Sequence, residues 1–160
     1  MPTQQIRSVS DDLRSVMRLF PTGVALLRTG EGERATAMTI NALMSVSLTP
    51  PQLLVSVLHS SRAHAVLEDH RAFSVHLLGD QQAETARLFA SASKPQGRDL
   101  AAFIDRYVVP GSLARLTCSL RSVYPGGDHS LFLGHVDAVE AAVSAEGPLL
   151  FHGGALRGFE

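Results

Sequence analysis

Cysteine and tryptophan are the scarcest residues of this 160-residue sequence, which has one cysteine, Cys118, and no tryptophan. A lone cysteine cannot form a disulfide within the chain, so we expect a reducing compartment, the cytoplasm. Charged residues make up 18% and the formal net charge is -1, which gives no electrostatic basis for binding nucleic acid or an anionic membrane. No apolar run approaches the roughly 18 residues of a membrane span.

The sequence also lacks the usual signatures of nucleotide-binding and hydrolytic domains. It has no GxGxxG at a strand-to-helix turn, no P-loop and no GxSxG elbow. A nicotinamide cofactor would therefore have to bind without a Rossmann domain. The pairs His59 and His64, and His70 and His76, do not have a spacing typical of zinc sites, so we expect no metal.

Most of the chain consists of short strand-like runs separated by turn residues. We predict strands over 24–29, 34–40, 43–48, 52–58, 72–78, 114–121, 130–143 and 149–151, and helices over 10–20, 63–70, 80–92 and 100–107. We expect the first helix to lie across the barrel or against a partner subunit. Because strands and helices do not alternate in βαβ order, the pattern predicts a mainly β fold with a few helices, an antiparallel barrel. We expect one domain over residues 1–160, with residues 1–9 disordered.

An almost uncharged stretch runs from Thr36 to Leu67, where Arg62 is the only formally charged residue. The stretch is nevertheless rich in hydroxyl and amide side chains. Strands that face solvent usually carry charges, so we expect these strands to be buried on both faces, where polar groups need partners. A planar, polar ligand is one possible partner, and the same groups at a dimer interface are the other.

Ser60-Ser61-Arg62 falls where the helix over 63–70 begins. The N–H groups at a helix start, two hydroxyls and a guanidinium form a site suited to a phosphate. The alternative is capping of the helix by Ser60 or Ser61, with Arg62 in solvent. For an isolated Ser-Ser-Arg, capping alone is the better interpretation, but it loses ground here because the site directly follows the uncharged stretch.

Gly127-Asp128-His129 is the second candidate group. Glycine allows the backbone to approach a ligand closely, and an imidazole at a strand start could hold a nicotinamide or position a proton. The alternative is a turn histidine paired with Asp128, which the spacing alone favours.

Several segments together resemble the flavin reductase-like, FMN-binding split-barrel family, and the resemblance covers nearly the whole chain. The most specific of them ends in Ser45-Val46-Ser47-Leu48-Thr49-Pro50-Pro51. The matching segments are 20–24, 37–51, 60–62, 127–134 and 150–154.

Resemblance to this family implies a homodimeric antiparallel split barrel that binds FMN or FAD without a covalent bond. It implies reduction of the flavin by NADH or NADPH, and delivery of reduced flavin to a separate monooxygenase. The implied site residues are Thr39, Ile40 and Asn41 along the isoalloxazine ring, Ser56 and Val57 beside the ring or ribityl chain, Ser60, Ser61 and Arg62 at the phosphate, Phe89 over the ligand, and His129 at the nicotinamide as the catalytic candidate.

Three departures from the family pattern suggest a more open cleft. Ala63 stands where a threonine usually contacts the phosphate, and His76 replaces a common asparagine. The segment between Phe89 and Leu113 is short and lacks a tryptophan. We predict an NAD(P)H:flavin oxidoreductase that treats flavin as a substrate. The alternatives are an oxidase or monooxygenase that retains its flavin, and a flavin-binding protein without turnover.

Overall fold

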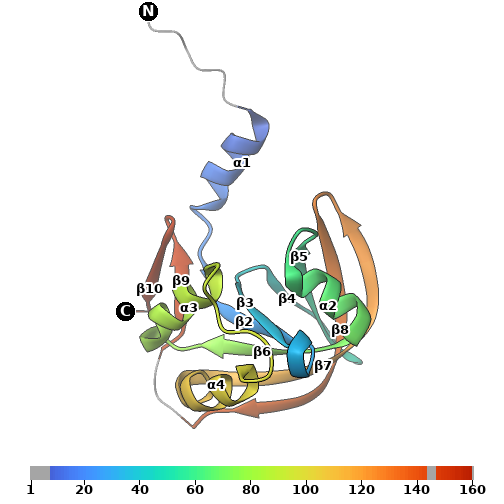
Figure 1. The fold of residues 1–160 in the computed structure, drawn as a ribbon. Coiled ribbons are helices and arrows are strands. Elements are labelled where there is room, and N and C mark those ends of the chain that lie inside the picture. Colours follow the sequence, from blue (N-terminus) through green and yellow to red (C-terminus); the bar gives the residue numbers. More distant parts are fainter. Residues whose placement is uncertain (1–7, 144–146, 160) are drawn as a thin grey trace, which may run out of the picture.

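The computed structural model describes residues 8–143 and 147–159. A seven-stranded antiparallel sheet forms most of it, with the strand order β3-β2-β6-β7-β8-β5-β4 (Figure 1). In chain order its strands are β2 (Ala25–Thr29), β3 (Thr36–Ile40), β4 (Leu43–Leu48), β5 (Pro51–Leu58), β6 (Ala72–Leu78), β7 (Ser112–Gly126) and β8 (His129–Ala141). A smaller antiparallel sheet has the order β1-β9-β10, from β1 (Thr22–Gly23), β9 (Leu149–His152) and β10 (Ala155–Gly158).

Short helices lie around the sheets. They are α1 (Val9–Met17), α2 (Arg62–His70), α3 (Ala83–Ala90) and α4 (Leu100–Tyr107), with the 3-10 turns η1 (Gly32–Arg34), η2 (Asp80–Gln82) and η3 (Val109–Gly111). In Figure 1, α2 lies beside β5, α3 lies beside β9, and α4 lies below β6. In the part of the chain that the structure describes, no helix is long and apolar enough to cross a membrane.

The barrel is split between β3 and β4. These strands are the two edges of the seven-stranded sheet, yet only Asn41 and Ala42 separate them in the chain. The sheet must therefore curl until its edges meet. Ala42 accepts a hydrogen bond from the backbone N–H of Ser56 on β5 at 3.2 Å. The predicted antiparallel split barrel is confirmed.

Two apolar cores lie on the two faces of the sheet. Alternate residues of β5, Leu53, Val55 and Val57, face the barrel interior with Phe73 and Phe132. The interior is packed tightly, since a Cβ added to Gly134 on β8 would lie 2.6 Å from Cζ of Phe73. A second core fills the space between the outer face and α3, α4 and β9, and its largest member is Phe89.

The expectation that the whole stretch from Thr36 to Leu67 is buried on both faces is wrong for β4. Most of its residues are exposed, with Met44 at 53% and Leu48 at 86%. The reason is topological, because β4 is an edge strand that pairs only with β5. Its side chains are uncharged although they face outward, so the missing charge does not reflect burial within this chain.

The helix α1 extends away from the barrel and buries none of its residues (Figure 1). It therefore does not lie across its own barrel. The side-chain oxygen of Ser8 caps it by accepting from the N–H of Asp11, two residues before the predicted start at Ser10. It ends at Met17, before the predicted end at Phe20. The predicted disorder of residues 1–9 falls chiefly on residues 1–7, which lie outside the described residues.

Candidate functional site

Asn41 lies where three hollows of the surface meet. We name them the α1 hollow, the β1 hollow and the α3 hollow, after elements that line them. The lining of the α1 hollow is Met17, Phe20, Thr22, Asn41, Ala42, Leu43, Met44, Leu54 and Ser56, around a cavity volume of about 450 Å³. Asn41 is on the two-residue connection that closes the barrel, which leaves its side chain exposed between the sheet edges.

The walls of the α1 and β1 hollows carry no charged side chain. Thr22, on β1, lines both of them, and its Oγ1 atom is buried without a hydrogen-bond partner among the described residues. Buried polar atoms are normally paired, so an unpaired one in the wall of two hollows indicates a missing partner. An apolar hollow with a few polar groups fits a large, uncharged, planar ring.

Thr39 and Ile40 come to the same place from β3. Ile40 lines the β1 and α3 hollows, while Thr39 lines only the α3 hollow. The hydroxyl of Thr39 donates to the backbone oxygen of Ala86 on α3 at 2.6 Å. This bond ties β3 to α3 and uses the Thr39 proton, so Thr39 has only its oxygen lone pairs left for a ligand.

Ser56 and Val57 are consecutive on β5 and face opposite sides of the strand. Ser56 lines the α1 hollow with Asn41. Val57 is fully buried in the barrel core, so its side chain is directed away from the hollow. The structure therefore brings Ser56 and Asn41 together and separates Val57 from them.

Ser60, Ser61 and Arg62 form the turn into α2. Ser61 caps the helix, since its Oγ accepts from the N–H of His64 at 3.2 Å and donates to the backbone oxygen of Leu58 at 2.8 Å. Arg62 is exposed, as in the capping alternative, and its Nη2 donates to the backbone oxygen of Glu33 in η1 at 2.8 Å. Ser60 is exposed. Ser61 thus caps the helix, as the capping alternative predicts, and the Arg62 guanidinium contacts η1.

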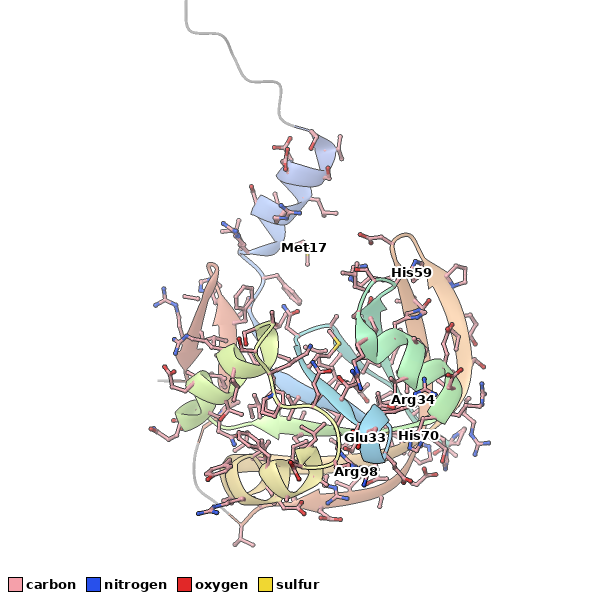
Figure 2. The ribbon with its side chains drawn as sticks, in the orientation of Figure 1. Met17, Glu33, Arg34, His59, His70 and Arg98 are labelled. Carbon is pink, nitrogen blue, oxygen red and sulfur yellow. The ribbon has the colours of Figure 1, made fainter. Side chains whose placement is uncertain are left out.

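The turn η1 gathers further charge beside Arg62. Glu33 forms an ion pair with Nε of Arg98, and Arg34 forms one with Asp69 of α2 at 2.8 Å. Figure 2 shows Glu33, Arg34 and Arg98 grouped at η1, well apart from Met17 at the end of α1. A phosphate at the start of α2 would lie next to this group.

His129 begins β8, opposite Leu58 at the end of β5. Its Nδ1 donates to Oδ1 of Asp128 at 2.7 Å, and this hydrogen bond lowers the pKa of Asp128. The pairing of His129 with Asp128 is the alternative that the spacing favoured. The backbone N–H of His59 donates to the oxygen of Asp128 at 3.0 Å, so the turn before β8 is fastened to the turn before α2.

Sequence reasoning missed a histidine network behind His129. The hydroxyl of Ser130 lies 2.8 Å from Nε2 of His64 and 3.1 Å from Nε2 of His59. Nδ1 of His64 lies 3.7 Å from Glu68 on the next turn of α2. Only the spacing His64-Glu68 was visible in the sequence, because the contact with Ser130 joins residues that lie far apart in the chain. Among the described residues, no cluster of three potential ligands could hold a metal.

Phe89 does not lie in any of these hollows. It is fully buried and packs edge-on against Phe103 of α4, with ring centroids 5.8 Å apart. The small side chains of Ala86 and Ala90 line the α3 hollow from the same helix. Phe89 thus holds α3 against α4, and its predicted place over a ligand is not what the structure has.

Comparison with known proteins gives one consistent result. The family described as "Flavin reductase like domain" matches residues 17–160. An NADH-dependent FMN reductase of Streptomyces nodosus subsp. asukaensis is 35% identical over 151 residues, which cover 90% of this chain and 82% of that protein. The reductase component of 4-hydroxyphenylacetate 3-monooxygenase from Thermus thermophilus is 35% identical over 144 residues, covering 90% of this chain and 92% of that protein.

One of the similar solved structures is also a flavin reductase, the NADH:FAD oxidoreductase of Streptomyces globisporus C-1027 in complex with NAD and FAD fragments. It superposes with a TM-score of 0.81 at 31% identity, over 98% of this chain and 97% of that chain.

Proposed function

The chain belongs to the flavin reductase-like domain family, and on that premise we propose that it is an NADH-dependent oxidoreductase that reduces FMN or FAD. The observation that carries the proposal is the uncharged α1 hollow, where Asn41, Ser56 and the unpaired Thr22 oxygen converge. A bound flavin supplies the redox chemistry there, taking up a hydride from the nicotinamide. NADH is preferred to NADPH in this proposal because the named relatives are NADH-dependent.

The residues of the hollow hold and orient the flavin ring in this proposal. The amide of Asn41 both donates and accepts, and the hydroxyls of Thr22 and Ser56 supply further hydrogen bonds to ring heteroatoms. The backbone of Ile40 and the lone pairs of Thr39 extend the same edge. The apolar side chains of Phe20 and Leu43 exclude water from the ring.

The start of α2 receives the flavin phosphate in this proposal. The helix dipole favours an anion there, and Ser60 and Ser61 add hydroxyls. Arg62 keeps most of its five donors available, because among the described residues only one hydrogen bond, to the Glu33 oxygen, engages the guanidinium. Ala63 is buried and offers no hydroxyl, so this phosphate site has one donor fewer than the family pattern.

His129 meets the nicotinamide in this proposal. Asp128 fixes the ring orientation by accepting from Nδ1, which leaves Nε2 free to contact the carboxamide. The strand pairing of His129 with Leu58 sets the start of β8 beside the segment that leads into the phosphate turn. His129 acts by binding and orienting the nicotinamide, and no side chain needs to serve as a strong base for hydride transfer.

A separate monooxygenase is the consumer of the reduced flavin in this proposal. Two relatives are named as reductase parts of monooxygenases. The single, buried, free Cys118 suits a reducing cytoplasm.

We also infer that two copies of the chain pair through α1 and β4. Both elements present apolar side chains to solvent, among them Leu13, Val16 and Met44. Contiguous exposed apolar surface of this kind marks an interaction site. The end of α1 also lines the ligand hollow through Met17, so pairing would bury the mouth of the site.

The decisive experiment mixes the purified chain with NADH or NADPH and with FMN, FAD or riboflavin under air. Loss of the nicotinamide absorbance is followed. We expect oxidation that requires both the protein and a flavin, and that is faster with NADH. Gel filtration after turnover should separate the flavin from the protein.

Two outcomes would overturn the proposal. If flavin fluorescence is quenched on binding but no nicotinamide is oxidised, the chain is a binding protein without turnover. If the flavin stays with the protein through gel filtration and reduced flavin is never released, the chain is an oxidase or monooxygenase that retains its flavin.

A further inference from the structure

A further hollow, with a polar lining, lies on the outer face of the sheet, opposite the barrel core. Val75 and Leu77 of β6 pack in the barrel core, so His76 between them faces outward. There His76 pairs in register with Arg115 on β7, and Ser74 pairs with Arg28 on β2. The helix α4 lines this group through Ile104 and Asp105, and the partly open space has a volume of about 160 Å³. We name this space the α4 hollow.

Three nitrogen atoms at the α4 hollow are buried without hydrogen-bond partners. They are Nε of Arg28, Nδ1 of His76 and Nε of Arg115. His76 is only 1% exposed. Among the ion pairs formed by the described residues, none involves Arg28 or Arg115. Buried polar groups rarely remain unpaired, and three of them around one cavity point to a common missing partner.

The charges and the size of the α4 hollow define that partner. Two guanidinium groups line it, and Asp105 is the one acidic residue in its lining. Glu140 pairs with Arg115 across the ladder, but it lines a neighbouring space. Guanidinium groups bind carboxylates and phosphates in preference to other partners. The volume is several times the roughly 30 Å³ of a water molecule in the liquid, which admits a small polyatomic anion.

We propose that Arg28, His76 and Arg115 form a binding site for a small oxyanion, inorganic or the carboxylate of a small acid, beneath α4. The arginines neutralise its charge and donate from the unpaired Nε atoms. His76 donates from Nδ1 when that nitrogen carries the proton. Asp105 opposes the anion from the rim of the hollow and weakens its binding.

The protonation of His76 reports on this site. Burial first, and then the charges of Arg115 and Arg28, lower its pKa from 6.5 to about 4, while Asp105 acts in the opposite direction. An anion in the α4 hollow favours the charged imidazole, so its binding must raise this pKa. By linkage, the anion must also bind more tightly as the pH falls toward that value.

The test uses the full chain with sulfate, with acetate, and with chloride as the ionic-strength control. The His76 ring signals are followed by NMR and assigned with the variant His76→Gln. We expect a saturable shift with sulfate or acetate but not with chloride, and a raised pKa for His76 at saturation. A stronger response to sulfate identifies an inorganic oxyanion, and a stronger response to acetate identifies a carboxylate.

Variants locate the binding. Arg28→Gln and Arg115→Gln should each weaken the affinity at least tenfold, whereas Asp105→Asn should strengthen it. The matched control is Arg121→Gln, an exposed arginine of the same strand β7, which should leave the affinity unchanged. If the Arg28 and Arg115 variants do not fold, the Asp105→Asn result decides, because Asp105 is exposed and its loss removes no core contact. Absence of a saturable shift at His76, or an affinity that Asp105→Asn does not raise, would overturn the proposal.

Discussion

The Arg62 guanidinium has one identified contact, with the backbone oxygen of Glu33, and its other donors remain available to a ligand. We predict that Arg62→Ala weakens FMN binding roughly tenfold or more, because a hydrogen bond to a charged group contributes about 1.5–3 kcal/mol. Riboflavin, which has no phosphate, should bind almost as well as to the unmodified chain. Fluorescence titration with both flavins measures the difference.

A matched control for this variant is Arg98→Ala. It removes a cation that pairs with Glu33, whose backbone oxygen also accepts from Arg62, but from a residue with no proposed ligand contact. Flavin affinity should be unchanged in it. An equal loss of FMN and riboflavin affinity in Arg62→Ala would disprove the phosphate role.

The position of a single residue was predictable where a sequence motif determined both the side chain and the backbone around it. Asn41 and Ser56 line one hollow, because the link between β3 and β4 brings both sheet edges together, and their contact with a flavin stays a prediction. Thr22 was not singled out, since an unpaired buried oxygen is visible only in three dimensions. Phe89 was misplaced because a helical aromatic at a given spacing faces the core or the ligand depending on the packing of α4.

Among the elements, β8 depends on the absence of a side chain at Gly134. A methyl group there would lie 2.6 Å from Cζ and 2.9 Å from Cε1 of Phe73, which is itself buried. We therefore predict that Gly134→Ala lowers the free energy of unfolding by roughly 1–3 kcal/mol, as overpacked cores do. Urea denaturation followed by circular dichroism measures the loss.

Gly23→Ala on β1 is the control for this substitution. An added Cβ at Gly23 meets no atom within 4 Å, so its stability should change little. If Gly134→Ala were as stable as the unmodified chain, the barrel interior would be looser than the contact with Phe73 implies.

Several elements have the predicted bounds because local pattern and tertiary environment agree. This holds for β4 (Leu43–Leu48), β6 (Ala72–Leu78) and α4 (Leu100–Tyr107). The strand β7 continues to Gly126, beyond the alternating residues, because its pairing with β8 sustains it. The strand β10 (Ala155–Gly158) has no strand pattern of its own and exists through its pairing with β9 across the Gly153-Gly154 turn.

At the scale of the whole molecule, α1 carries apolar side chains that its own barrel does not cover. Leu13 and Val16 are each 60% exposed. We predict that the chain sediments as a dimer, with twice its 17.1 kDa mass. The double variant with Leu13→Asp and Val16→Asp should sediment as a monomer. A charge placed in an apolar interface must be desolvated, which opposes association. Analytical ultracentrifugation measures the masses.

The control for the double variant is Ser15→Asp, which introduces one negative charge on another side of α1. It should leave the mass unchanged. A monomer in the unmodified chain at all concentrations would remove the proposed pairing. The exposure of β4 was not foreseen because an uncharged strand has the same sequence pattern whether its own chain or a second copy covers it.

The meeting of the sheet edges at Asn41 and Ala42 has a mechanical consequence. The seam is fastened by the peptide chain itself and not by a ladder between β3 and β4. We expect small rotations about the backbone bonds of this link to change the gap between the sheet edges while every strand pair stays intact. In the proposed function, a flavin would then enter and leave the hollow beside Asn41 without local unfolding of the strands around it.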